Sequence, residues 1–447
     1  MGLSGLQIYK LLPRTNCKEC GFPTCLAFAM KLAARQVELS ACPYVSDESK
    51  SQLDAASAPP IRLVSVGPEK RKVEVGNETV LYRHEKTFYH EPGLFYRIKD
   101  DLAEDEFAAR VAEIADYVVE RVGIELSANG VALECASGDA GTFAQRAEAV
   151  VEAGLPVILL CDDPAAVDAA LKAVGSTKPL IYGASDDTWE AMAGLAKQYE
   201  APLAVSTSDG LDGLAALTAK IKGAGVEDLV LDPGVRAWPQ VLKTQTTLRR
   251  LALKKNFRDL GYPTIVFPGE AAEDPVDEAL MAAQAVAKYA GFIVLDTFDP
   301  ASLYPLLTLR QNIYTDPQKP IQVSPGLYEI GDPGPDAPLL VTTNFSLTYF
   351  SVAGEVEGLG RPAWLMICDS EGMSVLTAWA AGKFDAERIG KSVKEFDVAS
   401  KLNHRKIVIP GHVSSISGEL EEELPDWEIL VGPREAIGIP SYLRNWS

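Results

Sequence analysis

Four of the seven cysteines lie in a short N-terminal stretch, where their spacing could bind metal. The spacing is C-x2-C-x4-C-x16-C, and the candidate ligands are Cys17, Cys20, Cys25 and Cys42. Gly21 and Pro23 bend the backbone between the first three cysteines. The apolar residues after Cys25 recur at helical spacing, so we expect a helix that carries the chain away before it returns at Cys42.

Four thiols without a histidine suit three kinds of chemistry: a 4Fe-4S cluster, a tetrahedral zinc ion or disulfides. Disulfides are disfavoured because we find no secretory signal. Zinc sites more often pair one C-x2-C with a second, and Pro43, directly after the last cysteine, is a frequent neighbour of cluster ligands. The pattern favours one 4Fe-4S cluster, with zinc as the alternative, and hence an electron-transferring protein.

The other three cysteines are Cys135, Cys161 and Cys368, and each ends an apolar run, VALEC, VILLC or WLMIC. A single cysteine in such a position usually behaves as a small buried hydrophobic residue. We therefore expect these three to be structural and dispensable for metal binding.

Length and charge limit the possible functions. A chain of 447 residues exceeds what one hydrophobic core usually supports, so two or three domains are expected. Its 42 basic and 62 acidic residues give a net charge of −20, which would repel phosphate backbones and argues against nucleic-acid binding. The longest apolar run is strand-sized, so we expect neither a membrane span nor a membrane partner, and a cytoplasmic location.

The middle of the chain alternates apolar strands with helical stretches, which predicts a closed TIM (β/α)8 barrel. Before it, the sequence KVEVGNETVLY predicts a β-hairpin around Gly76-Asn77. The eight expected barrel strands are 131–135, 156–161, 179–183, 202–206, 229–232, 264–267, 292–296 and 321–324. Several end in acidic residues, notably Asp162-Asp163, Asp232 and Asp296. Such residues build a barrel's active face, but they are also common helix N-caps.

A last α/β module follows the Pro- and Gly-rich segment GDPGPDAP. The runs LLVTTNF, AWLMICDS, RKIVIPG and WEILVGP predict buried parallel strands, so we expect a Rossmann-like fold. Ligands of such sheets bind beyond the carboxyl ends of the strands. Those ends are small, hydroxylated or glycine-rich and could let a large flat ligand approach the backbone; they are 342–344, 370–373, 411–414 and 432–434. No G-x-G-x-x-G dinucleotide fingerprint follows a strand.

Several stretches together carry a family resemblance. They are NCKECGFPTCLAFAMKLA with ACPYV, ETVLYRHEKTFYHEPGLFY, CDSEGMSVLTAWAAGKF and IPGHVSSISGELEEELPDWEILVGPREA. Over its whole length the chain resembles the large (gamma) subunit family of the corrinoid iron-sulfur protein of the acetyl-CoA (Wood-Ljungdahl) pathway. The four N-terminal cysteines show no departure from the family pattern.

The resemblance implies an α/β multidomain chain with a domain order that agrees with the patterns above. The expected divisions are a 4Fe-4S domain at 1–57, a linker with a β-hairpin at 58–100, a TIM barrel at 101–325 and a Rossmann-like corrinoid-binding domain at 326–447. It also implies a methyl carrier: cobalt in the Co(I) state accepts a methyl cation from methyltetrahydrofolate on a separate methyltransferase and donates it to acetyl-CoA synthase. The 4Fe-4S cluster would reduce accidentally formed Co(II).

The implied partners are a small (delta) subunit in a heterodimer, the methyltetrahydrofolate methyltransferase, and CO dehydrogenase/acetyl-CoA synthase. Many corrinoid proteins ligate cobalt through the histidine of D-x-H-x-x-G, but none of the four histidines fits that motif. The resemblance likewise implies a base-off corrinoid of the cobalamin type without a protein ligand below the cobalt. Leaving out that donor makes reduction to Co(I) easier, because an axial nitrogen stabilises the higher oxidation states.

No residue of this chain is expected to be catalytic by itself. The expected corrinoid contacts follow the four strand ends and are Leu340, Thr342, Thr343, Asn344, Ser346, Ser370, Glu371, Gly372, Met373, Ser374, Val375, Gly411, His412, Ser414, Gly432 and Pro433. Two other functions remain open: a pterin-dependent methyltransferase in which the barrel is the catalyst, and a ferredoxin-like electron relay.

Overall fold

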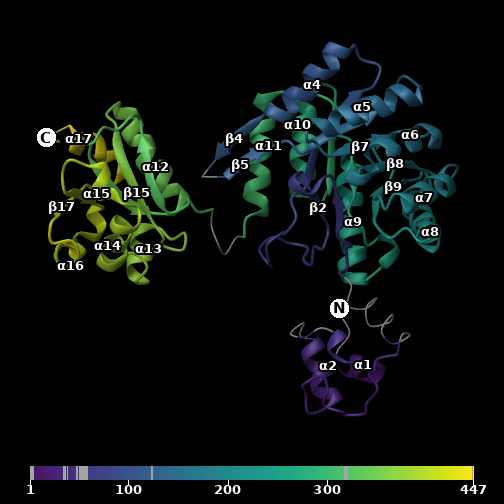
Figure 1. Ribbon diagram of the computed structural model, residues 1–447, viewed down its shortest axis with the longest axis horizontal. Helices are drawn as coiled ribbons and strands as arrows, with labels where there is room; N and C mark the ends of the chain where they lie inside the picture. Colours follow the sequence, from purple (N-terminus) through teal and green to yellow (C-terminus); the bar gives the residue numbers. More distant parts are fainter. Residues whose placement is uncertain are drawn as a thin grey trace. The chain divides into compact units, whose positions relative to one another are not determined.

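The computed structural model describes residues 5–33, 37, 39–46, 49, 59–121, 124–316, 321–444 and 446 (Figure 1). The chain forms two compact units, residues 1–117 with 127–314, and residues 118–126 with 315–447. The finer division into an N-terminal cysteine domain, a linker, a barrel domain and a C-terminal domain stays a prediction. No helix in the described ranges is both long and apolar enough to cross a membrane.

The N-terminal cysteine segment contains the helices α1 (Gly5–Leu11) and α2 (Cys25–Ala33) and the 3-10 turn η1 (Leu39–Ala41). The two helices pack through Ile8, Leu12, Phe28 and Ala29, which are all buried. As expected, the run after Cys25 is helical. It begins at the cysteine itself, so this helix start fixes one candidate ligand.

The first unit contains an eight-stranded parallel sheet in the order β10-β9-β8-β7-β6-β3-β12-β11. A parallel bridge between Leu231 and Thr264 joins the two end strands and nearly closes the barrel. The strands are β3 (Gly93–Lys99), β6 (Gly130–Glu134), β7 (Val157–Leu160), β8 (Leu180–Ala184), β9 (Leu203–Ser206), β10 (Leu229–Asp232), β11 (Ile265–Val266) and β12 (Phe292–Leu295). This arrangement confirms the TIM barrel.

A helix follows each barrel strand, as the right-handed crossover of parallel strands requires. In order, these helices are α4 (Glu104–Asp116), α5 (Ala140–Glu152), α6 (Pro164–Val174), α7 (Trp189–Gln198), α8 (Gly210–Gly223), α9 (Trp238–Lys255), α10 (Pro275–Ala287) and α11 (Pro300–Tyr314). Short 3-10 turns accompany them: η3 (Gly175–Thr177), η4 (Arg258–Leu260) and η5 (Pro268–Glu270).

The prediction of the eighth barrel strand was wrong. Residues 321–324 form only an isolated bridge, Gln322 to Phe345, outside the barrel. The missing strand is β3, which lies before residue 101, where we expected the barrel to begin. Its sequence GLFYRIK is interrupted by charged residues at 97 and 99, and this obscured an otherwise apolar run.

The predicted hairpin around Gly76-Asn77 was also wrong. The observed hairpin pairs β1 (Val64–Val66) with β2 (Val73–Val75), and the turn between them contains η2 (Glu69–Arg71). Its four valines join the apolar residues of the barrel interior. The alternating pattern therefore reflects burial against the barrel rather than pairing across residues 76 and 77.

The C-terminal unit has a five-stranded sheet in the order β13-β15-β14-β16-β17. The four predicted strands are confirmed as parallel, and an unforeseen antiparallel strand, β13 (Gly326–Ile330), forms one edge. The parallel strands are β14 (Leu339–Thr343), β15 (Ala363–Cys368), β16 (Lys406–Ile409) and β17 (Glu428–Val431). Because β14 is followed by β15 on one side and β16 on the other, the strand order reverses between β14 and β16.

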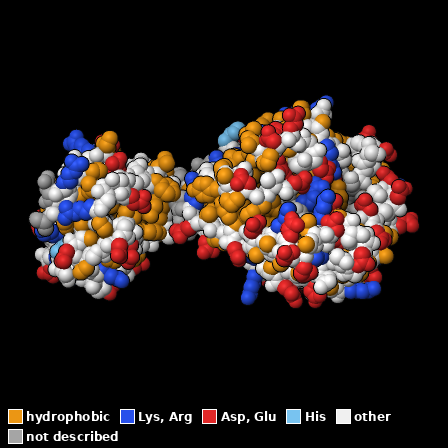
Figure 2. All heavy atoms as spheres, turned by 90° about the horizontal axis from the view of Figure 1, so that it is seen from above, with side chains coloured by type: hydrophobic (Ala, Val, Ile, Leu, Met, Phe, Trp, Pro, Cys, Tyr) orange, Lys and Arg blue, Asp and Glu red, His pale blue; other side chains and the backbone are white. Residues whose placement is uncertain are grey.

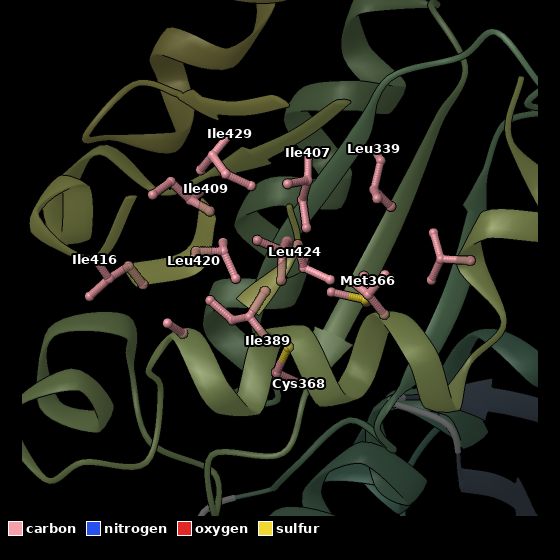
Figure 3. Close-up of a cluster of buried hydrophobic side chains, with 14 of the residues drawn as sticks. Leu339, Met366, Cys368, Ile389, Ile407, Ile409, Ile416, Leu420, Leu424 and Ile429 are labelled. Carbon is pink, nitrogen blue, oxygen red and sulfur yellow. The ribbon is translucent and has the colours of Figure 1, made fainter. Parts of the chain in front are cut away.

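Helices cover this sheet, and Figure 3 shows the apolar side chains that pack between sheet and helices, among them Met366, Ile389 and Leu420. The helices are α12 (Ser346–Leu359), α13 (Val375–Ala380), α14 (Ala386–Glu395), α15 (Val398–Lys401), α16 (Ser417–Glu423) and α17 (Ile439–Leu443), with 3-10 turns η6 (Gly411–Ile416) and η7 (Ala436–Gly438).

A second hairpin, β4 (Val118–Arg121) with β5 (Ile124–Ser127), follows α4 in the sequence, yet most of it is grouped with the C-terminal unit. Tyr328 and Tyr349 lie within reach of its Glu120. Burial raises the pKa of both tyrosines, and the Glu120 carboxylate adds to the rise.

Candidate functional site

The four N-terminal cysteines are held by an irregular loop and two short elements. Cys17 and Cys20 lie in the loop between α1 and α2, Cys25 begins α2, and Cys42 follows η1. The Cys25 N–H donates to Asn16 Oδ1 at 2.8 Å, and the Asn16 N–H donates to Cys25 Sγ at 3.4 Å. This reciprocal pair fixes the start of the helix relative to the loop. Hydrogen bonds to sulfur are also a means of adjusting the reduction potential of a bound cluster.

The electrostatics of this loop fit a cationic metal centre. Burial raises the pKa of the Cys42 thiol; a backbone hydrogen bond at Tyr44 opposes the rise, and the nearby thiols of Cys20, Cys25 and Cys17 add to it. Bound cations relieve repulsion between neighbouring thiolates. Within the described ranges no three ligating side chains surround one point as they would for a single ion. A cubane does not require that, because it holds its four thiolates on four separate iron atoms.

The isolated cysteines lie in less polar surroundings. Cys161 and Cys368 are buried and Cys135 is partly buried. Burial raises the pKa of the thiols of Cys161 and Cys368 to about 12, so both stay protonated near neutral pH. This agrees with a structural role for these cysteines.

A pocket of about 350 Å³ opens at the carboxyl ends of β14, β16 and β17. It lies where the strand order reverses, which is the position where open parallel sheets bind ligands. Its walls come from the strand ends, from α12 and α13, and from the segment after β17. Hydrophobic side chains gather on one side of this unit in the surface view (Figure 2).

One wall residue has an unused hydrogen-bonding group. Thr342 is only 2% exposed, and its Oγ1 has no hydrogen-bond partner among the described residues. A buried hydroxyl left in this way costs about 1 to 3 kcal/mol, so such groups normally have a partner. Because Thr342 lines the pocket, a ligand with amide groups could supply that partner. The pocket thus suits a mostly apolar ligand, or part of one, that carries polar groups.

The mouth of the barrel has a different character. Arg97 lies 3.0 Å from Glu270 and 2.9 Å from Asp296, and Arg236 lies 2.8 Å from Asp232 and also contacts Glu270. Both guanidinium groups lie over the ring of Phe267. The charged groups at these strand ends therefore form ion pairs with one another, although Arg97 Nε and Glu134 Oε2 are buried without a hydrogen bond among the described residues.

Two of the predicted acidic strand ends belong to this network, and the third has another role. Tyr182 Oη donates to Asp232 at 2.6 Å, and burial raises the pKa of Asp296 although Arg97 opposes that rise. Asp163 instead caps α6 by accepting from the Ala165 N–H, as the N-cap interpretation expected.

Comparison with known proteins identifies the family. The family described as "CO dehydrogenase/acetyl-CoA synthase delta subunit" matches residues 63–443, and the family described as "Putative Fe-S cluster" matches residues 12–44. The corrinoid/iron-sulfur protein large subunit of Moorella thermoacetica is 46% identical over 99% of both chains. The chain belongs to the corrinoid/iron-sulfur protein large-subunit family.

Other members of the corrinoid/iron-sulfur protein large-subunit family are more distant. The acetyl-CoA decarbonylase/synthase complex subunit gamma of Methanopyrus kandleri is 37% identical and covers 99% of this chain and 98% of its own. The family description names a delta subunit, whereas these relatives, which match end to end, are large or gamma subunits. Dihydropteroate synthase from Thermus thermophilus is 19% identical, with a TM-score of 0.39 over 57% of this chain and 100% of that chain.

Seven of the sixteen corrinoid contacts expected for a member of this family line the pocket: Leu340, Thr342, Ser374, Val375, His412, Gly432 and Pro433. Nine do not: Thr343, Asn344, Ser346, Ser370, Glu371, Gly372, Met373, Gly411 and Ser414. Whether any of them contacts a corrinoid stays a prediction, but several of the nine have clear structural roles.

Asn344 organises the turn after β15. Its Oδ1 accepts hydrogen bonds from the Ser370 N–H at 2.9 Å, the Ser370 hydroxyl at 2.7 Å and the Gly372 N–H at 3.0 Å. Gly372 has φ +72°, and a Cβ there would lie 2.7 Å from the side chain of Gln322. In the same turn, Glu371 forms an ion pair with Lys383.

Gly411 permits a close approach of two backbones. A Cβ at this position would lie 2.5 Å from Gly432 O and 2.9 Å from the backbone N of Arg434. The Gly411 N–H also donates to Pro433 O at 3.0 Å. Gly411 therefore positions the segment that forms one wall of the pocket, although it does not line the pocket itself.

Sequence reasoning missed α12 and with it one wall of the pocket, formed by Leu347, Thr348, Ser351 and Val352. A usable signal was present, because α12 has apolar residues on all sides although only one side covers the sheet. Leu347 is 64% exposed and Phe350 is 44% exposed. Other wall residues outside the expected contacts are Val341, Leu376, Val408, Ile409, Pro410, Arg434, Glu435, Ala436 and Ile439.

Proposed function

We propose that this chain is the methyl-carrying subunit of a corrinoid/iron-sulfur protein of the acetyl-CoA pathway. The observation that carries the proposal is the pocket at the strand-order reversal, with its unpartnered Thr342 hydroxyl, in a chain that matches a corrinoid/iron-sulfur protein large subunit end to end. The C-terminal unit would be the Rossmann-like corrinoid domain.

A corrinoid bound there would supply a cobalt that accepts a methyl cation as Co(I) and passes it to the acceptor enzyme. The chain's own residues would hold and shield this group. Thr342 Oγ1 would hydrogen-bond an amide side chain of the corrinoid, while Leu340, Val375 and Ile439 would form apolar walls that exclude water. Excluding water protects a strongly reducing centre from side reactions.

The four N-terminal thiolates would hold a 4Fe-4S cluster, which supplies single electrons at low potential. The Asn16 N–H would donate to the Cys25 sulfur, and the apolar residues Phe22 and Phe28 beside the loop would limit access of water. Both effects bear on the reduction potential, which depends on hydrogen bonds to sulfur and on solvent exposure.

We expect no residue of this chain to ligate cobalt, because none of its histidines stands in a D-x-H-x-x-G motif. His412 lines the pocket, and its Nε2 lies 3.3 Å from Glu435 Oε1. Electron paramagnetic resonance of the Co(II) state should lack splitting from an axial nitrogen. Such splitting would contradict the base-off arrangement.

The proposed partners are a small subunit in a heterodimer, a methyltetrahydrofolate methyltransferase, and CO dehydrogenase/acetyl-CoA synthase. The family description and the names of the relatives support an acetyl-CoA synthase complex. Size-exclusion chromatography of the chain expressed with a candidate small subunit should give one co-eluting species. A monomer that accepts and donates methyl groups at full rate would contradict this assembly.

The decisive experiment is metal analysis after purification without oxygen. We expect about four iron, about four sulfide and about one cobalt per chain. Cys20→Ala should remove the iron and leave the cobalt, whereas Cys368→Ala should remove neither. Zinc in place of iron would disprove the cluster, and iron without cobalt would favour the ferredoxin-like relay. A pterin-dependent methyltransferase would bind pterin at the barrel mouth, where the charged groups described above already pair with one another.

A further inference from the structure

The ionisable side chains of the C-terminal pocket are gathered in one corner. Among the described residues that line it, only His412, Arg434 and Glu435 can carry a charge, and the others are apolar, hydroxylated or glycine. All three come from the segments that follow β16 and β17. Any charged part of a ligand in this pocket therefore has one place where it can be recognised.

The pairing within this corner leaves one cation available. His412 Nε2 lies 3.3 Å from Glu435 Oε1, so the carboxylate is turned toward the imidazole. The guanidinium of Arg434, in contrast, forms no hydrogen bond or ion pair with any residue that the structure describes. The chain as a whole is acidic, with a net charge of −20. Arg434 is a cation without an acidic partner among the described residues, and it lies beside a pocket wall that is otherwise almost uncharged. Such a cation is suited to bind an anion.

The backbone of Arg434 is held in place by close packing. The Gly432 N–H donates to Ile409 O at 2.9 Å, and the Gly411 N–H donates to Pro433 O at 3.0 Å. Since Gly411 has no Cβ, the backbone N of Arg434 can approach it closely. The backbone of Arg434, an exposed residue that lines the pocket, is thus held in position before any ligand binds.

The proposed ligand has one matching anionic group. The corrin ring carries neutral amide side chains, whereas the nucleotide loop of a complete corrinoid contains a phosphodiester with one negative charge. When the base does not ligate the cobalt, this loop extends away from the ring, and its phosphate needs a partner. Arginine suits phosphate because its planar fork of N–H donors can form two parallel hydrogen bonds.

We propose that Arg434 binds the phosphodiester of the corrinoid nucleotide loop, and that His412 acts as a positioning residue by holding Glu435 away from Arg434. This inference rests on the proposed function, because it requires a corrinoid in the pocket. It extends that function in two ways. Arg434 recognises the nucleotide loop, and His412 affects corrinoid binding without contacting the cobalt.

The test compares two corrinoids on the full chain without its corrinoid, with binding followed by visible absorption. Cobalamin has the nucleotide loop, and cobinamide has the same ring without it. Arg434→Gln should weaken cobalamin binding about tenfold and leave cobinamide binding unchanged. Glu435→Gln should strengthen cobalamin binding a few-fold, because it removes a competing negative charge. Lys401→Gln, an exposed cation that does not line the pocket, is the matched control and should change neither.

The role of His412 is tested by rescue. His412→Gln should weaken cobalamin binding, because the released Glu435 can then pair with Arg434, and adding Glu435→Gln should restore it. A merely structural role of His412 would not be rescued in this way. Inorganic phosphate at millimolar concentration should compete with cobalamin only weakly, since the loop is tethered to a bound ring; strong competition would mean that Arg434 binds free phosphate instead.

The outcomes separate the inference from the function on which it rests. If the native chain binds neither corrinoid, the proposed function fails. If it binds both and Arg434→Gln weakens both alike or neither, the function stands and the assignment of Arg434 is overturned.

Discussion

The carboxyl ends of parallel strands form two contrasting regions in this chain. At the barrel mouth the strand ends carry Arg97, Asp232 and Asp296, and these side chains are paired with one another or with Arg236 and Glu270. At the C-terminal sheet the pocket walls are mostly apolar or hydroxylated, and they enclose a volume of about 350 Å³ beside the unpartnered hydroxyl of Thr342. Both positions are where their folds usually bind ligands. The difference is one of charge: the barrel mouth is occupied by ion pairs, whereas the C-terminal pocket has mostly apolar and hydroxylated walls.

The largest expected effect comes from filling the close contact behind the C-terminal pocket. Gly411→Ala would place a Cβ 2.5 Å from Gly432 O, so the segment carrying Gly432 and Arg434 must move. We expect loss of measurable corrinoid binding and destabilisation of about 2 to 4 kcal/mol, with iron content unchanged. Cobalt and iron analysis together with chemical denaturation would measure both effects.

Gly418→Ala is the matched control, because nothing lies within 4 Å of a Cβ at that helical position. It should leave cobalt binding intact. Full cobalt content in Gly411→Ala would show that the wall formed by residues 432–434 is not needed for binding.

The converse experiment removes one ion pair at the barrel mouth. Arg236→Met would leave the fully buried Asp232 without its ion-pair partner and should destabilise the protein by about 3 kcal/mol, while cobalt binding stays normal. Arg110→Met removes the exposed pair with Glu106 and should cost less than about 1 kcal/mol. Thermal unfolding and cobalt analysis would test this. Selective loss of cobalt from the Arg236 variant would connect the barrel mouth to the corrinoid.

A smaller effect is expected from removing one buried hydroxyl in each region, because only the hydroxyl at the pocket should affect corrinoid binding. Thr342→Val removes the unpartnered hydroxyl of the pocket and should stabilise the corrinoid-free chain by about 1 kcal/mol while weakening corrinoid binding about tenfold. Thr218 in α8 of the barrel also has a buried Oγ1 without a partner among the described residues, so Thr218→Val should stabilise similarly but leave corrinoid binding unchanged. Equal binding by the two variants would mean that Thr342 Oγ1 does not contact the ligand.

The smallest expected effect is a pH dependence at the barrel mouth. Burial raises the pKa of Glu278, although the backbone N–H groups of Asp296 and Thr297 oppose the rise. A carboxyl group with a raised pKa in the folded state contributes stability in acid and loses it as the pH rises through that pKa. The stability of the native chain relative to Glu278→Gln should therefore decline from acidic to neutral pH. If the stability of the native chain relative to Glu278→Gln instead grew over this range, the pKa of Glu278 would be lowered in the folded protein.

Much of the fold could be predicted because most buried strands are apolar runs between turn residues. Seven barrel strands and four C-terminal strands were predicted in this way. β3 was missed because Arg97 and Lys99 interrupt its apolar run. α12 was missed because its apolar residues do not keep to one side, since one side covers the sheet and part of the rest lines the pocket.

The candidate site was less predictable than the fold. Thr342, His412 and Gly432, which were chosen as strand ends, line the pocket, but the rule of strand ends could not separate wall residues from residues that build the turns. Asn344 looks like a ligand-binding residue in the sequence, whereas in the structure its side chain hydrogen-bonds the turn after β15 and Gln322. That distinction depends on hydrogen-bond partners far apart along the chain, which spacing does not reveal.

The hairpin β4–β5 has a consequence for synthesis of the protein. It belongs mostly to the C-terminal unit but is made roughly 190 residues before the rest of that unit begins at residue 315. At ribosomal speeds of about 5 to 20 residues per second, the nascent hairpin must wait about 10 to 40 s for its neighbours. An isolated two-stranded hairpin is marginally stable in water, so Leu126, which is buried in the finished protein, would be exposed to ribosomes and chaperones before the rest of its unit is made.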